Sequence, residues 1–132
     1  MSAMATVLII EDEFAIADLL EMVLLDEGYQ VLKAGNGRQG LERLFEGPRP
    51  DLIISDFMMP VLDAVDLLRA MRANEAQRDI PCIVMSSMPE ENLRARIDGY
   101  AGFIQKPFQL DEMVKLVATV LSTSQPHLEA DA

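Results

Sequence analysis

The sequence has little of what marks secreted, disulfide-bonded or membrane proteins. It contains one cysteine, Cys82, so it cannot form an intramolecular disulfide, which fits a reducing compartment. Cys82 lies in an apolar run, which favours a buried hydrophobic role over a reactive thiol. No apolar run reaches the roughly 18 residues of a membrane helix. The first four residues lack the basic region of a signal peptide. We therefore expect a cytoplasmic domain without a membrane span.

Basic residues are also scarce. The 132 residues include 11 lysines and arginines against 22 acids, which gives a net charge of −11. Nucleic-acid binding draws much of its affinity from basic contacts to phosphate, so direct DNA or RNA binding is disfavoured. The excess of acids is compatible with a cation site. Half of the residues are apolar, enough to build the core of one domain.

Short apolar runs alternate with helical patterns along the chain. Strands are expected near residues 6–10, 29–34, 51–55, 81–86 and 102–105. Helices are expected near residues 14–27, 37–46, 63–73, 90–97 and 109–122. Five such strand–helix units predict an α/β fold: a five-stranded parallel sheet with helices on both faces.

Acidic residues stand where two of these strands end. Asp56 follows an apolar run that reads as a strand buried on both faces, and Glu11 and Asp12 follow another. Open α/β sheets bind their ligands at the carboxyl ends of their strands. The pattern therefore suggests a cation site with an aspartyl nucleophile.

The order of these and other landmarks resembles the response-regulator receiver domain of two-component signalling, in particular the stand-alone chemotaxis type. The landmarks are Glu11-Asp12, Asp56, Ser86 and Lys106-Pro107-Phe108. The resemblance covers residues 5–122 and leaves residues 123–132 as a short polar tail. It implies a flavodoxin-like sheet with strand order 2-1-3-4-5.

That strand order makes the first and third strands neighbours, so that the three acids converge. Two carboxylates about 5 Å apart repel by roughly 3 kcal/mol at an effective dielectric constant of about 20. A cation offsets this cost, and oxygen donors suit Mg²⁺. The resemblance implies that Asp12, Asp56 and the backbone carbonyl of Met58 hold the metal, with Glu11 acting through water.

The resemblance also implies roles for the other landmarks. Asp56 would accept the phosphoryl group, with Lys106 as the neighbouring cation. Ser86 would donate its hydroxyl to a phosphoryl oxygen, and Phe103 would turn inward with it as part of the switch. The Lys106–Pro107 peptide is commonly cis in this family.

Two partner surfaces are expected by the same resemblance. On the first helix, Phe14, Asp18 and Leu25 would face a histidine kinase or histidine phosphotransfer protein. The second surface, formed by the fourth and fifth helices and the fifth strand, would meet a downstream protein or a second copy after phosphorylation. It contains Arg94, Arg96 and Lys115. The protein would be a monomer or a phosphorylation-dependent homodimer.

Several residues have simpler interpretations or depart from the family pattern. Asp12 could cap the first helix, and Phe103 could serve only core packing. Ala64 stands where glycine is usual; alanine would cost around 1 kcal/mol if that position needs a positive φ. Ser87 stands where alanine is usual, which would make the approach to the phosphoryl group narrower or more polar. Bulky Met58 and a second methionine, at position 88, predict slow hydrolysis of the phosphorylated aspartate.

The expected function is that of a single-domain response regulator that catalyses only its own phosphorylation and dephosphorylation. It would not turn over a free substrate. The signal would leave through a target protein, or the phosphoryl group would move on to a histidine in a phosphorelay. Alternatives are an interaction module independent of phosphorylation and an aspartate-nucleophile phosphatase. The phosphatases typically carry a second acid two residues after the nucleophile, where this chain has Met58.

Overall fold

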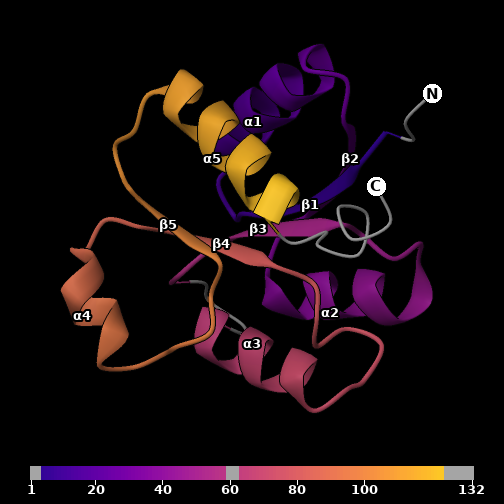
Figure 1. The fold of residues 1–132 in the computed structure, drawn as a ribbon, viewed down its shortest axis with the longest axis vertical. Coiled ribbons are helices and arrows are strands. Elements are labelled where there is room, and N and C mark those ends of the chain that lie inside the picture. Colours follow the sequence, from indigo (N-terminus) through magenta and orange to yellow (C-terminus); the bar gives the residue numbers. More distant parts are fainter. Residues whose placement is uncertain (1–3, 59–62, 124–132) are drawn as a thin grey trace.

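Five strands and five helices alternate along the chain in the computed structural model, which describes residues 4–58 and 63–123 (Figure 1). The strands are β1 (Thr6–Ile10), β2 (Gln30–Ala34), β3 (Leu52–Asp56), β4 (Cys82–Ser86) and β5 (Gly102–Gln105). The helices are α1 (Phe14–Asp26), α2 (Gly37–Glu46), α3 (Ala64–Arg72), α4 (Glu90–Arg94) and α5 (Leu110–Thr123). The expected tail begins at Thr123, and residues 124–132 lie outside the described part, so this domain boundary stays a prediction.

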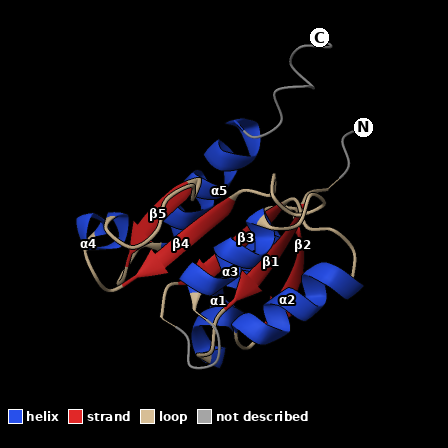
Figure 2. Ribbon diagram, turned by 90° about the horizontal axis from the view of Figure 1, so that it is seen from below, coloured by secondary structure: helices blue, strands red, loops and turns tan. Residues whose placement is uncertain are grey.

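The five strands are parallel and hydrogen-bonded in the order β2-β1-β3-β4-β5. Helices α1 and α5 cover one face of this sheet, and α2, α3 and α4 cover the other (Figures 1 and 2). The expected fold class and strand order are therefore confirmed. No helix in the described ranges is long and apolar enough to cross a membrane.

Two apolar cores lie on opposite sides of the sheet because successive side chains of a strand point to opposite faces. In β1, Val7 and Ile9 join the core under α1 and α5, whereas Leu8 and Ile10 join the core under α2, α3 and α4. All four are fully buried. The continuous apolar run of β1 thus contributes side chains to both cores. This burial on both faces holds the strand, and therefore its carboxyl end, in place.

Helix α4 is shorter than expected, since it ends at Arg94 instead of near residue 97. One more turn of backbone hydrogen bonding follows, in which Ile97 N–H donates to the Leu93 carbonyl at 2.9 Å. Gly99 then adopts a φ of +77°, which favours glycine and directs the chain toward β5. The pattern of apolar residues therefore overestimated the helix by the length of this turn.

Two further expectations concern local structure. Ala64 is fully buried as the first residue of α3, and no residue other than glycine has a positive φ in the described ranges. The strain considered for alanine at this position is therefore not present. Cys82 is buried as expected, and burial raises the pKa of its thiol to about 12.

Candidate functional site

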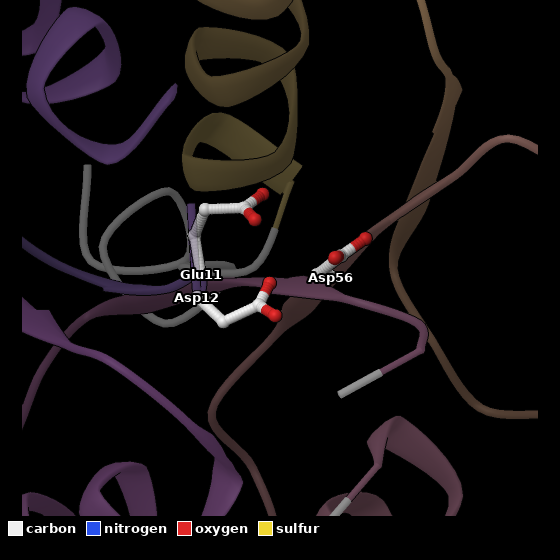
Figure 3. A group of neighbouring side chains, drawn as sticks. All are labelled: Glu11, Asp12 and Asp56. Carbon is white, nitrogen blue, oxygen red and sulfur yellow. The ribbon is translucent and has the colours of Figure 1, made fainter. Parts of the chain in front are cut away.

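Acidic side chains gather at the carboxyl edge of the sheet, where the neighbouring strands β1 and β3 end (Figure 3). Asp56 is the last residue of β3, and Glu11 directly follows β1. Glu11, Asp12 and Asp56 each offer a carboxylate oxygen, and these oxygens lie within 4.8 Å of one another. The expected convergence is therefore present. With Lys106, these three residues form what we call the strand-end cluster.

Glu11 is the most buried acid of the cluster, with 1% of its surface exposed against 9% for Asp56. Its Oε1 accepts a hydrogen bond from Nζ of Lys106 at 3.0 Å, and its Oε2 accepts one from the Glu13 backbone N–H at 3.1 Å. Burial raises the pKa of Glu11, and the two hydrogen bonds offset only part of that rise. Glu11 thus forms a direct hydrogen bond with Lys106, a contact that was not predicted from the sequence.

Lys106 also faces the expected nucleophile, with its Nζ 3.2 Å from Oδ1 of Asp56. Burial raises the pKa of Asp56 and the nearby Asp12 raises it further, whereas Lys106 lowers it. Burial alone would lower the pKa of Lys106, but Glu11 and Asp56 together keep it above its usual value. Lys106 is therefore a fixed positive charge beside the carboxylate of Asp56.

Asp12 is the exposed member of the strand-end cluster. Helix α1 has Glu13 at its N-cap and no side-chain capping bond, so the alternative role of Asp12 as a cap is wrong. When ionised, the three carboxylates of the cluster carry more negative charge than the single ammonium of Lys106 can offset. Carboxylate oxygens with one exposed side suit Mg²⁺, which retains several waters. The residues present therefore fit a divalent cation.

The remaining oxygen expected to bind the metal is the backbone carbonyl of Met58. The side chain of Met58 is 60% exposed, beyond the buried Phe57. Metal binding by this carbonyl stays a prediction. Residues 59–62, which follow Met58, lie outside the described residues.

Ser86 and Phe103 occupy strand positions consistent with their expected roles. Ser86 ends β4, and its Oγ accepts a hydrogen bond from the Met88 backbone N–H at 2.9 Å. A hydroxyl that accepts a bond keeps its own hydrogen for donation. Phe103 is partly buried against the core under α2, α3 and α4. The Lys106–Pro107 peptide is cis, as the resemblance implied. The switch roles themselves stay predictions.

The first expected partner surface is exposed on α1. Phe14 is 79% exposed and Leu25 is 52% exposed, while Asp18 accepts a hydrogen bond from Nζ of Lys33 at 3.0 Å. Two further exposed apolar residues of the same helix, Leu19 and Met22, were missed by the sequence reasoning. The apolar part of this surface is therefore larger than predicted.

An apolar groove of about 390 Å³ next to the strand-end cluster was also missed. It lies between α1 and the connection from β5 to α5, and the exposed Ser87 borders it. Its lining residues are Ile16, Leu19, Leu20, Ser87, Lys106, Pro107, Phe108 and Leu110. No sequence pattern could have revealed it, because its walls come from segments almost 100 residues apart.

The residues of the second expected surface are exposed but differ in their contacts. Arg94 lies 3.7 Å from Glu90, to which Tyr100 also donates a hydrogen bond at 2.9 Å. Arg96 lies over the aromatic ring of Phe57. Lys115 projects from α5. Whether a partner binds here stays a prediction.

Comparisons with known proteins agree with this geometry. The family model for the response regulator receiver domain matches residues 7–118. A probable transcriptional regulatory protein from Picosynechococcus is 36% identical over 133 residues, covering 95% of this chain and 52% of that protein. The receiver domain of a signal transduction histidine kinase from Syntrophus aciditrophicus is 34% identical with a TM-score of 0.82, covering 92% of both chains.

A third similar protein is the receiver domain of the sensor histidine kinase PA1611 from Pseudomonas aeruginosa, solved with a magnesium ion coordinated in its active-site cleft. It is 26% identical with a TM-score of 0.82, covering 91% of this chain and 99% of that chain. The chain spans about half the length of the curated relatives first matched.

Proposed function

The chain belongs to the response-regulator receiver family, whose members act in phosphorylation-based signalling, and on that premise we propose that Asp56 is its phosphoacceptor. The phosphoryl group would come from a phosphohistidine of a histidine kinase or histidine phosphotransfer protein. The observation that carries this proposal is the position of Lys106, whose Nζ lies 3.2 Å from Asp56 and 3.0 Å from Glu11.

Phosphoryl transfer requires an in-line nucleophile and compensation of charge on the phosphoryl oxygens. A carboxylate oxygen of Asp56 attacks the phosphorus, and the bond from phosphorus to the donor nitrogen breaks. The bonding electrons remain on the imidazole, which takes a proton from water, and the aspartate becomes an acyl phosphate. Lys106 is placed to offset charge on this product, and Ser86 can donate its hydroxyl to a phosphoryl oxygen.

Mg²⁺ is the cofactor that we propose for this step. Asp12, Asp56 and the Met58 carbonyl would hold it, with Glu11 acting through water because Lys106 occupies its Oε1. The metal supplies positive charge that neutralises the phosphoryl oxygens. The magnesium ion in the PA1611 receiver domain supports this assignment.

Phosphorylation would shift an existing conformational equilibrium, because the new group forms different bonds in the two states. Ser86 and Phe103 would report the change to the surface formed by α4, β5 and α5. The output would be a downstream protein, a second copy of the chain, or a histidine that receives the phosphoryl group in a phosphorelay.

The proposal describes a protein that modifies itself and does not turn over a free substrate. We also infer a cytoplasmic location, where a phosphohistidine donor would be available to this chain. The lone buried Cys82 is compatible with that compartment.

Intact-protein mass after incubation with Mg²⁺ and acetyl phosphate tests this function. Wild type should gain one phosphoryl group, and chelation of Mg²⁺ should prevent the gain. Asp56→Asn should gain none. Asp66→Asn, which changes an exposed carboxylate on α3, is the matched control and should behave as wild type. Equal modification of wild type and Asp56→Asn would place the acceptor elsewhere.

A further inference from the structure

One contact joins the phosphoacceptor end of β3 to the region of α4. The guanidinium of Arg96 lies over the ring of Phe57, 5.2 Å from its centroid. Phe57 directly follows Asp56 in sequence, and Arg96 follows the C-terminal end of α4. A cation at this distance over an aromatic face is attracted to it. Two segments with different proposed roles therefore share one side-chain contact.

Phe57 is rigidly connected to the strand-end cluster. Its side chain is fully buried. Its backbone N–H donates to the Met85 carbonyl at 2.7 Å, and its carbonyl accepts from the Ala64 N–H at 3.1 Å. Movement of the Phe57 ring would therefore disturb the backbone that carries the phosphoacceptor.

The other partner lies in a segment with few restraints. Residues 90–97, the α4 segment, contain a helix of only five residues, which is too short to be stable alone. Leu93 and Ile97 are its buried apolar residues. At its start, Glu90 accepts the Tyr100 hydroxyl bond at 2.9 Å. The contact of Arg96 with Phe57 is thus one of a small number of restraints on this segment.

Two neighbouring arginines form ion pairs with acidic side chains, whereas Arg96 contacts the aromatic ring of Phe57. Arg72 lies 2.9 Å from Asp98, and Arg94 lies 3.7 Å from Glu90. Both pairs lie on the surface formed by α3 and the α4 region. The charged group of Arg96 instead reaches Phe57, the residue beside the phosphoacceptor.

We propose that Arg96 is a positioning residue that links the phosphoacceptor end of β3 to the α4 segment through Phe57. The link itself is present without phosphorylation, and its use in signalling rests on the proposed function of Asp56. Displacement of the α4 segment uncovers the Phe57 ring, and displacement of Phe57 removes the surface on which Arg96 lies. Each end therefore influences the population of shifted conformations at the other.

Amide hydrogen exchange of the unphosphorylated protein, followed by NMR, tests the link at both ends. An exposed cation–π contact corresponds to about a two- to fivefold change in an opening equilibrium. Arg96→Ala should therefore speed exchange by about this factor at the amides of Phe57 and Ile97, and Arg96→Lys should preserve part of the protection. Arg38→Ala removes an equally charged, exposed side chain from α2 and should change neither amide. Faster exchange at Ile97 alone would overturn the link.

A double-mutant cycle shows whether Phe57 carries the effect. Phe57→Leu keeps an apolar side chain but removes the aromatic face. In that background, Arg96→Ala should no longer change exchange at Ile97, because the two residues form one interacting pair. An undiminished effect of Arg96→Ala in the Phe57→Leu protein would mean that Arg96 acts through another residue, and the proposal would be wrong.

The rate of phosphorylation separates positioning from a purely local structural role. With Mg²⁺ and acetyl phosphate, Arg96→Ala should modify Asp56 about two- to fivefold more slowly, and Arg96→Lys should recover part of the rate. An unchanged rate in Arg96→Ala overturns the positioning role. If wild type itself gains no phosphoryl group, the proposed function fails, while the exchange measurements still decide whether the link exists.

Discussion

The strand-end cluster and the α4 segment lie on the same molecule but are held by different interactions. The cluster lies at the carboxyl ends of β1, β3 and β5. The apolar side chains of β1 and β3 are fully buried between two layers of helices. The α4 segment has two buried apolar residues, Leu93 and Ile97, and its side chains Glu90 and Arg96 make contacts at the surface.

This difference suggests how one domain can combine a fixed site with a movable reporter. A rigid sheet can hold three carboxylates near one another although they repel. A short helix with few buried contacts opens at low free-energy cost, as expected for elements that move in allostery.

The largest effect on stability is expected from truncating buried apolar side chains of the helices. Leu67 in α3 and Leu93 in α4 are both fully buried. We expect Leu67→Ala to lower the free energy of unfolding by about 3 kcal/mol, and Leu93→Ala by about 2 kcal/mol, the lower end for leucine, because α4 can readjust. Urea denaturation measures both. Equal losses, without faster local exchange in Leu93→Ala, would contradict the contrast.

The next effect concerns the metal. Mg²⁺ at 100 times its dissociation constant should stabilise the folded protein by about 2.7 kcal/mol, because it binds the folded cluster and not the unfolded chain. Thermal unfolding with and without chelator measures this shift. Asp12→Asn should reduce it strongly. Asp111→Asn, an exposed carboxylate on α5, is the control and should retain the full shift.

The cluster also predicts a pH dependence in Mg²⁺-free buffer. Burial raises the pKa of Glu11 and of Asp56 above the usual values of 4.5 and 3.8. Between each usual value and the raised one, the folded protein binds more protons than the unfolded chain. The free energy of unfolding should therefore decrease as pH rises through that window.

Urea denaturation at a series of pH values measures this slope. Glu11→Gln should flatten it, because the buried carboxyl is replaced by a group that does not titrate. Glu91→Gln, on the exposed side of α4, should leave the slope as in wild type. A free energy of unfolding that increases through the window would contradict the prediction. It would show that the folded protein stabilises the ionised carboxylates of Glu11 and Asp56 more than their burial implies.

The smallest effect concerns the lifetime of the phosphorylated aspartate. Met58 and Met88 should limit access of water, so we expect slow hydrolysis of the wild-type acyl phosphate. Met58→Ala should speed hydrolysis by less than about tenfold, which is 1.4 kcal/mol in the barrier. Decay of the phosphorylated mass measures this rate. Met22→Ala is a control of similar exposure on α1, at 64% against 60% for Met58. Rapid wild-type decay would contradict the prediction.

Much of the fold was predictable because its signals are local. Apolar runs located all five strands to within a residue or two. Asp56 was correctly placed at a strand end, although it belongs to β3 instead of following it. The predicted end of α4 was wrong. A helical turn and Gly99 follow Arg94, and their sequence continues the periodic pattern of the helix.

The candidate site was predictable as a set of residues but not as a set of contacts. Asp12, Asp56 and Lys106 could be identified from the ends of their strands, and the structure brings them together. The direct bond from Lys106 to Glu11 spans 95 residues of sequence. This bond depends on the directions in which the segments after β1 and β5 leave the sheet. Spacing along the sequence does not encode those directions.

The alternation of strands and helices, and the carboxylates at two strand ends, follow from local sequence signals, because hydrophobic period and turn residues act over short distances. The hydrogen bond between Glu11 and Lys106 and the contact of Arg96 with the Phe57 ring depend instead on tertiary packing. Both contacts join separate segments, and they arise when packing of the two cores fixes the distances and directions between those segments.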